Sequence, residues 1–324
     1  MLQVTFQQNN IILGIDTSCY TTSIAAISLD KEVIFNEKII LKVKKDCKGL
    51  RQSEAVFQHI SNLGEISENI KDKISNYKVV GVCVSSKPRP IKDSYMPVFT
   101  VGLNFAKFLS SVNNCELYET SHQENHIEAS LFQNNIKNKE KFLAVHMSGG
   151  TTEVLLVRKN NHGYDVEIVG GSLDVSFGQL VDRLGVQLGY NFPCGKYIDK
   201  DAVNCNLNIK QGLKTSVKEG YMNLSGIENQ INKIAQDYSK EYTSKVLLDT
   251  LSRCMYKSLV YICKQYEIEE VLFAGGVSAS KYMSSKLTNI LRKEKINAYF
   301  TDSELATDNA LGCAIIGLNQ IKKV

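Results

Sequence analysis

The sequence of 324 residues lacks several features that mark special classes of protein. It has no continuous run of about 18 or more apolar residues, the length that a membrane-spanning helix requires. The opening segment MLQVTFQQNN lacks both a basic region and a continuous apolar region, so we expect no secretory signal. The nine cysteines are scattered and never spaced as Cys-x-x-Cys, which argues against a disulfide framework or a zinc ribbon. We therefore expect a cytoplasmic protein without membrane contact, in which most cysteines are small buried apolar residues.

The bulk composition is that of an ordinary globular protein. Apolar residues make up 43% of the chain, and its length is enough for two lobes that share an interface. The net charge of +4 is mild, but basic residues gather in two groups. These are Lys42, Lys44, Lys45, Lys48 and Arg51, and then Lys87, Arg89 and Lys92. Each group is either a solvated surface or a contact for nucleic-acid phosphates, and the sequence leaves both interpretations open.

Two segments of the chain resemble each other, LGIDTSCYTTSIAAI at residues 13–27 and LAVHMSGGTTEVLLV at residues 143–157. Each has an apolar strand, a turn of small or hydroxylated residues and a second apolar strand, which predicts a β-hairpin. The tip of such a hairpin presents backbone N–H groups that suit phosphates. Two hairpins, one opening each half, predict a duplicated α/β fold with a nucleotide between two lobes. Two unrelated hairpins are the alternative.

The rest of the chain alternates between strand and helix patterns, as in an α/β protein. We predict strands over 79–84 and 271–274 and near 298–300, helices over 100–112, 122–132, 177–188, 227–266, 281–291 and 308–322, and a turn over 192–199. No linker rich in Pro, Gly or Ser separates the halves, so we expect them to pack together. The expected N-terminal lobe is 1–135, completed by the C-terminal helix 304–324, and the expected C-terminal lobe is 136–303.

Two histidines are candidate metal ligands. His122 and His126 stand four positions apart, which on a helix places both imidazoles on one face, a spacing that suits one metal ion. Two surface histidines are the alternative. In the metalloprotease pattern His-Glu-x-x-His the base follows the first histidine directly, whereas Glu124 comes two positions later and faces away. Proteolysis of that type is therefore not expected.

Two further residues are candidates to complete a metal site. Asp308 offers a carboxylate at the start of the final predicted helix, although an N-terminal helix cap is the alternative role. His146 ends the strand that leads into the second hairpin, so it is a candidate fourth ligand. The alternative is a histidine with hydrogen bonds of its own at a strand end.

Glycine-rich turns are candidate phosphate sites. Residues 148–151 form a tip where backbone amides can approach an anion, and Gly275-Gly276, between a strand and a helix, gives a second close approach. Asp182 and Asp199 supply carboxylates for ribose hydroxyls.

Seven ordered motifs resemble one known family. They are Ile12-Leu-Gly-Ile-Asp-Thr-Ser-Cys19, His122-x-Glu124-x-His126, Ser148-Gly-Gly-x-Thr152, Gly178-x-x-x-Asp182, Pro193-x-Gly195, Gly275-Gly-Val277 and Thr307-Asp-Asn-Ala310. The family makes threonylcarbamoyladenosine in tRNA and was long labelled sialoglycoprotein endopeptidase. The match runs from about residue 11 to 318, nearly the whole chain.

The resemblance implies an actin/Hsp70-like ATPase fold and a zinc or iron ion held by His122, His126 and Asp308. Some members add a tyrosine where this chain has His146. The implied reaction moves a threonylcarbamoyl group from threonylcarbamoyl-AMP to N6 of an adenosine next to the anticodon and releases AMP. The implied contacts to the adenylate, whether threonylcarbamoyl-AMP or ATP, are Met147, Ser148, Gly149, Gly150, Thr151, Asp182, Gly195, Asp199, Gly276 and Ser280. The implied partners are tRNA and other proteins of the pathway.

The chain departs from the family pattern near the implied site. Tyr20 and Thr21 replace an acidic pair, Asn125 and Cys194 each replace a glycine, and Ser280 replaces an asparagine. Residues 85–90, Ser-Ser-Lys-Pro-Arg-Pro, stand where Gly-Pro-Gly is usual. We interpret the chain as a divergent paralogue. The alternative is a non-catalytic nucleotide-binding scaffold that pairs with a true family enzyme, although such paralogues lack the metal ligands.

Overall fold

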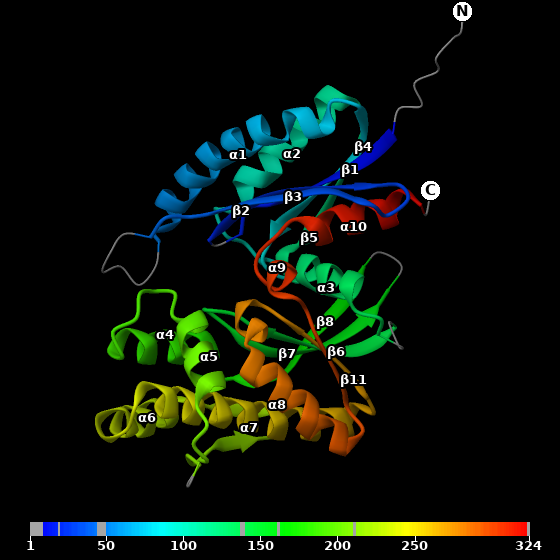
Figure 1. Ribbon diagram of the computed structural model, residues 1–324. Helices are drawn as coiled ribbons and strands as arrows, with labels where there is room; N and C mark the ends of the chain where they lie inside the picture. The colour runs from blue at the N-terminus through cyan, green and yellow to red at the C-terminus, as the bar shows by residue number, and fades with distance from the viewer. Residues whose placement is uncertain are drawn as a thin grey trace, which may run out of the picture. The chain divides into compact units, whose positions relative to one another are not determined.

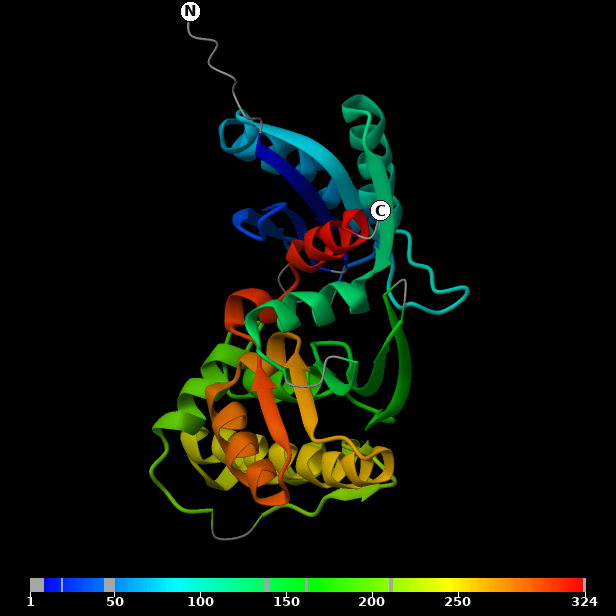
Figure 2. The ribbon, with the colours of Figure 1, turned by 90° about the vertical axis from the view of Figure 1, so that its right-hand side faces the viewer.

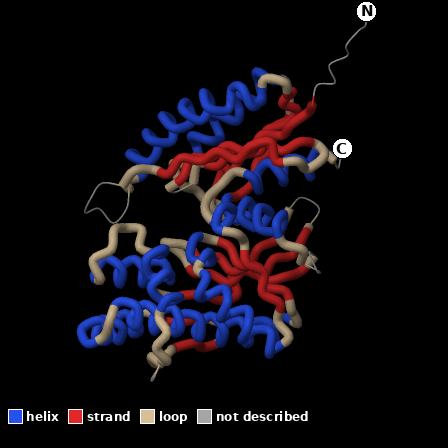
Figure 3. Tube along the Cα trace, in the orientation of Figure 1, coloured by secondary structure: helices blue, strands red, loops and turns tan. Residues whose placement is uncertain are grey.

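The computed structural model describes residues 9–18, 20–43, 50–136, 140–160, 163–209 and 212–322. Cys19, Cys47, Lys44, Lys45 and Lys48 lie outside these described residues. The chain forms two compact units, each of which contains both helices and strands (Figure 3). Unit 1 comprises Met1–Phe132, Asn161–Tyr164 and Asp308–Val324, and unit 2 comprises Gln133–Asn160 and Asp165–Thr307. Within the described ranges, none of the helices is long and apolar enough to cross a membrane.

Unit 1 is built on a five-stranded sheet of order β3-β2-β1-β4-β5. The strands are β1 (Asn9–Asp16), β2 (Thr21–Ser28), β3 (Val33–Ile40), β4 (Tyr77–Lys87) and β5 (Glu116–Ser121). The first three strands are antiparallel, whereas β4 runs parallel to β1 and β5 runs parallel to β4. The hairpin predicted over residues 13–27 is confirmed as the β1–β2 pair, in which Asp16 lies opposite Ser23.

The helices of unit 1 cover both faces of this sheet. They are α1 (Gln52–Ile74), α2 (Phe99–Asn113), α3 (His122–Gln133) and α10 (Leu311–Ile321). Helices α1 and α2 lie along one face and α10 lies along the other (Figure 1). Gly14 of β1 allows the close approach of α10, because a Cβ at this position would lie 2.2 Å from the carbonyl oxygen of Ala310. The chain end thereby packs against the first strand.

Unit 2 is built on a seven-stranded sheet of order β12-β11-β6-β7-β8-β10-β9. The strands are β6 (Lys141–Met147), β7 (Thr152–Lys159), β8 (Tyr164–Ser172), β9 (Ser216–Lys218), β10 (Tyr221–Asn223), β11 (Glu270–Ala274) and β12 (Asn297–Phe300). Strands β6, β11 and β12 are parallel, and Figure 2 shows β11 and β12 side by side. The second predicted hairpin is confirmed as the antiparallel β6–β7 pair.

The helices of unit 2 include a long one, against which several of the others pack. They are α4 (Phe177–Gln187), α5 (Gly195–Asn204), α6 (Ser225–Asp237), α7 (Lys240–Tyr266), α8 (Lys281–Leu291) and α9 (Ser303–Ala306). Buried side chains of α7, among them Leu247, Leu251 and Met255, share one apolar core with Leu143 and Val145 of β6. The spacing of four residues between these three side chains of α7 places them on one face of the helix.

Three predicted elements differ from the structure. The helix predicted over 227–266 is two helices, because the chain is extended at Tyr238 and Ser239, and the Ser239 side chain caps α7 by accepting from the backbone N–H of Tyr242. The predicted turn over 192–199 ends early, since α5 already begins at Gly195. The final helix begins at Leu311 and has Ala310 at its N-cap position, so Asp308 is not its cap.

The close packing at Gly14 gives a stability test. We expect Gly14→Ala to lower the free energy of unfolding by about 1–3 kcal/mol, because the new methyl group would displace α10 from β1. The matched control is Gly64→Ala in α1, where a Cβ would meet nothing within 4 Å. This control should raise stability by about 0.5–1 kcal/mol, since alanine favours helix over glycine. Urea denaturation measures both, and equal stability of the two variants would contradict this account of the packing.

Candidate metal centre and glycine loops

The three predicted metal ligands meet in unit 1. His122 and His126 lie one turn apart on α3, and Asp308 lies just before α10. The two Nε2 atoms are 3.1 Å apart, and Asp308 Oδ1 lies 3.3 Å from Nε2 of His126 and 3.7 Å from Nε2 of His122. Ligand atoms of all three residues lie within 4.8 Å of one another.

The ligand atoms of these three residues suit a divalent cation of intermediate hardness. Two imidazole nitrogens and one carboxylate oxygen are ligands that zinc and ferrous iron accept. A tetrahedral ion with bonds of about 2.0–2.2 Å sets its ligand atoms roughly 3.3–3.6 Å apart. The observed separations of 3.1 to 3.7 Å are close to that range, so small side-chain adjustments are enough to hold an ion. With three protein ligands, such an ion keeps a position for substrate or water.

Local hydrogen bonds fix the start of α3. The Ser121 hydroxyl accepts from the backbone N–H of Glu124, and the Glu124 carboxylate accepts from the backbone N–H of Ser121 at 2.9 Å. The hydroxyls of Thr120 and Ser121 donate to the same carboxylate oxygen. This reciprocal pattern is a capping box, which places His122 in the first turn. Glu124 therefore holds the helix end and does not occupy the position of a protease base.

Asp16 is a further residue of the site, and the sequence alone predicted no role for it. It ends β1, is 0% exposed, and its Oδ1 lies 3.2 Å from Nδ1 of His122. The hydroxyl of Ser18 donates to Oδ2 at 2.5 Å, and the hydroxyl of Ser85 donates to Oδ1. A carboxylate that binds one ring nitrogen fixes the orientation of the imidazole. Asp16 thereby directs Nε2 of His122 toward the other two ligands.

Two nearby carboxylates, Asp16 and Asp308, determine the charge of His122. Burial lowers the pKa of His122, but the charge of Asp16, its hydrogen bond and the charge of Asp308 outweigh burial and raise this pKa to about 9. Burial raises the pKa of Asp16, and the pairing with His122 outweighs it, so the net shift is downward. In the metal-free chain a proton on His122 therefore supplies positive charge to two carboxylates. A divalent cation bound by the three ligands would supply that charge instead and would release the proton.

The loop after β6 has the form expected of a phosphate site. The Ser148 hydroxyl accepts from the backbone N–H groups of Gly150 at 3.3 Å and Thr151 at 3.1 Å. Gly178 of α4 packs beneath the loop, where a Cβ would lie 2.5 Å from the carbonyl oxygen of Ser148. At Gly149 and Gly150 a Cβ would meet nothing within 4 Å. The packing of Gly178 thus fixes one side of the loop, whereas the space beside Gly149 and Gly150 is open.

The second glycine turn lies against the first. Gly275 has a φ of +90°, a conformation that favours glycine, and a Cβ there would lie 2.4 Å from the carbonyl oxygen of Met147. Gly276 follows, and its own Cβ position is open. Strand β11 pairs with β6 in parallel, so both loops leave the same edge of the sheet. Ligands of open α/β sheets bind at this carboxyl edge.

The predicted ribose carboxylates make hydrogen bonds within the protein. Asp199 accepts from the Ser280 hydroxyl and from the backbone N–H groups of Lys281 at 3.0 Å and Tyr282 at 3.1 Å, so it caps α8. Asp182 accepts from the backbone N–H of Cys194 at 2.7 Å, directly before Gly195. Burial raises the pKa of Asp182 against the effect of this hydrogen bond.

The carboxylates Asp182 and Asp199 thus shape the starts of α5 and α8. Their contact with a nucleotide stays a prediction, as does that of Ser280. His146 belongs to unit 2, where its Nδ1 lies 3.4 Å from the Thr151 hydroxyl, whereas the three ligands belong to unit 1. Its role as a fourth ligand also stays a prediction.

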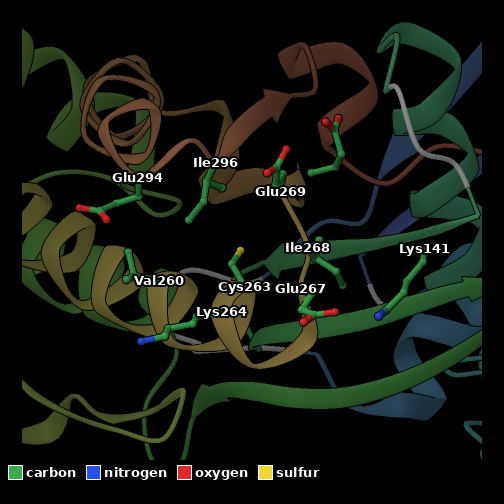
Figure 4. A pocket seen from close by; sticks show the side chains of 10 residues that line it. Lys141, Val260, Cys263, Lys264, Glu267, Ile268, Glu269, Glu294 and Ile296 are labelled. Carbon is green, nitrogen blue, oxygen red and sulfur yellow. The ribbon is translucent and has the colours of Figure 1, made fainter.

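A pocket of about 660 Å³ lies elsewhere in unit 2 (Figure 4). Its lining includes Lys141 and Glu270, the first residues of β6 and β11, together with Glu267 and Glu294. It therefore lies at the amino ends of the strands, opposite the glycine loops. We place the candidate nucleotide site at the glycine loops, because backbone that no Cβ obstructs suits a phosphate and a rim with several carboxylates does not.

Solved structures with a related arrangement establish the fold. HypF from T. kodakarensis matches 99% of this chain with a TM-score of 0.65 at 13% identity, and this chain spans about half (49%) of HypF. Component A of the (R)-2-hydroxyglutaryl-CoA dehydratase of Acidaminococcus fermentans matches over 96% of this chain and 99% of its own, with a TM-score of 0.56 at 12% identity. A glucokinase of the ROK family from Streptomyces griseus has a TM-score of 0.54 at 8% identity, over 95% and 99% of the two chains. The predicted actin/Hsp70-like α/β fold is confirmed.

Sequence comparisons identify the family. The chain is 26% identical over 310 residues to a tRNA N6-adenosine threonylcarbamoyltransferase of Fusobacterium nucleatum, covering 93% of this chain and 88% of that protein. It is 29% identical over 320 residues to the enzyme of the same name from Thermosipho melanesiensis, covering 95% and 94%. The family model described as tRNA N6-adenosine threonylcarbamoyltransferase matches residues 32–315. The chain is therefore a divergent member of the tRNA N6-adenosine threonylcarbamoyltransferase family.

Proposed function

We propose that this chain transfers a threonylcarbamoyl group from threonylcarbamoyl-AMP to N6 of an adenosine next to the anticodon of tRNA, with a zinc or iron ion bound. Membership of the family supports the transfer. The observation that carries the metal-dependent part is the convergence of His122, His126 and Asp308. The proposed place of action is the cytoplasm, with partner proteins of the same pathway.

The proposed reaction is a direct acyl transfer. The exocyclic amine of adenosine attacks the carbamoyl carbon, the bond from that carbon to the phosphate oxygen breaks, and AMP leaves while the amine loses a proton. No covalent protein intermediate is required. A bound metal ion would act as a Lewis acid toward the carbonyl or phosphate oxygens of the adenylate.

In this proposal the protein's own residues bind and orient the adenylate. The loop of Gly149, Gly150 and Thr151 binds the phosphate, because no Cβ obstructs the approach of an anion to the backbone at the two glycines. Met147 and Gly276 also contact the adenylate in this proposal, and Asp182, Gly195, Asp199 and Ser280 surround the ribose and base. The hydrogen bonds of Asp199 preorganise the start of α8, which limits rearrangement when the adenylate binds.

A non-catalytic scaffold is the competing function. Replacement of the family's acidic pair by Tyr20 and Thr21, and of its asparagine by Ser280, motivates it. Scaffold paralogues lack the metal ligands, whereas His122, His126 and Asp308 are all present in this chain and lie close together. We therefore favour the transferase.

The first test is metal content. We expect purified wild-type protein to hold about one equivalent of zinc or iron, and His122→Ala to bind it at least ~100-fold more weakly, since one of three ligands is lost. Elemental analysis and competition with a chelating dye measure this, and circular dichroism checks that the variant is folded. His146→Ala in parallel reports whether His146 adds a fourth ligand. A metal-free wild type that still binds an adenylate would contradict the metal part of the proposal.

The second test concerns Asp16. We expect Asp16→Asn to weaken metal binding ~10–100-fold, because the amide keeps the shape of the carboxylate but loses the charge that orients His122. Glu37→Gln is the matched control, because Glu37 is a carboxylate of the same unit that pairs with Lys73 at the surface. Its metal affinity should equal that of the wild type. Equal affinities of Asp16→Asn and Glu37→Gln would show that Asp16 does not support the metal site.

The third test is complementation. We expect the chain to restore threonylcarbamoyladenosine in the tRNA of a strain that lacks its own transferase, and we expect His122→Ala to fail. Mass spectrometry of nucleosides from bulk tRNA measures the product. Soluble, metal-loaded wild-type protein that restores no modified adenosine would favour the scaffold instead.

A further inference from the structure

Asn125 lies on α3 between the two histidine ligands and is 0% exposed. Its side-chain amide makes two hydrogen bonds to the segment that carries Asp308. The Nδ2 group donates to the backbone carbonyl of Asn309 at 2.6 Å, and Oδ1 accepts from the backbone N–H of Cys313 at 2.8 Å. One side chain thus binds both the residue after Asp308 and the first turn of α10.

The hydrogen bond from Cys313 satisfies one of the first N–H groups of α10, for which the N-cap residue offers no side-chain partner. The first backbone N–H groups of a helix have no partner within it, and a side chain at the N-cap position usually accepts from one of them. The N-cap residue of α10 is Ala310, which makes no side-chain cap bond. Asn125 accepts from the third residue of α10 instead, although it comes from another helix.

Gly312 of α10 lies so close to Asn125 of α3 that a residue with a Cβ does not fit at position 312. A Cβ on Gly312 would lie 1.9 Å from the backbone oxygen of Asn125 and 2.6 Å from its Oδ1. Asn309 tightens the same turn, since its Oδ1 accepts from the backbone N–H of Leu311 at 3.0 Å. The turn between Asp308 and α10 therefore rests directly on α3.

We infer that Asn125 is a positioning residue that holds Asp308 against His122 and His126, an inference that rests on the proposed metal site. An amide suits this role because it donates and accepts at once, so it fixes the turn at two points. A glycine, usual at this place in the family, has no group that can make either bond. Asn125 thereby makes the distance from Asp308 to the histidines a property of the fold before metal binds.

The experiment compares three variants with the wild type. Asn125→Ala removes both hydrogen bonds, and Asn125→Asp keeps an acceptor for Cys313 but loses the donor to Asn309. Asn113→Ala is the matched control, since Asn113 is in the same unit and its Nδ2 donates to Leu109 within α2. Affinity for Zn²⁺ is measured by competition with a chelating dye, and amide hydrogen exchange of residues 309–313 is measured in metal-free protein.

We expect Asn125→Ala to bind Zn²⁺ ~10-fold or more weakly and to exchange faster at residues 309–313, with Asn125→Asp intermediate and Asn113→Ala unchanged. If Asn125→Ala does not fold, Asn125→Asp carries the comparison alone. Wild-type zinc affinity and wild-type exchange in the folded variants would overturn the inference. A wild type that binds no Zn²⁺ would instead contradict the proposed metal site, and exchange would still decide whether Asn125 holds the turn.

Discussion

The packing of α10 against β1 and α3 is the interaction on which the site depends. Asp308 reaches the histidines only because the chain end returns to the first strand, where Gly14 allows close approach. Asn125 and Gly312 then set the separation between α3 and the turn before α10. These contacts join backbone to backbone or to a short side-chain amide. The separation between α3 and the turn before α10 can therefore vary little. The candidate metal ligands are therefore held close together by the fold itself.

The second constraint on the site is the charge of its side chains. Asp16 is fully buried beside His122, and Asp308 adds a second carboxylate nearby. A buried carboxylate with a second carboxylate nearby is unfavourable unless a positive charge accompanies them. The two carboxylates raise the pKa of His122 to about 9, which favours a proton on this ring when no metal is bound. A divalent cation held by His122, His126 and Asp308 would supply this charge in place of the proton, so its uptake would release the proton.

The sequence predicted those parts of the structure that depend on local pattern. The two hairpins, helix α8 and the helical spacing of His122 and His126 follow from periodicity within short windows. The split between α6 and α7 was missed because both sides of Tyr238 and Ser239 carry helical periodicity. The pairing of Asp16 with His122 was missed for a different reason. The two residues lie far apart in sequence, and no local pattern marks a contact that the topology creates.

The central claim is that His122, His126 and Asp308 hold one metal ion. Crystals of the purified protein with an adenylate analogue, measured at the zinc and iron absorption edges, test it most directly. The account predicts one anomalous peak within bonding distance of Nε2 of His122, Nε2 of His126 and the Asp308 carboxylate, with Asp16 still bonded to Nδ1 of His122. The absence of a peak there in a structure that holds the analogue would contradict it.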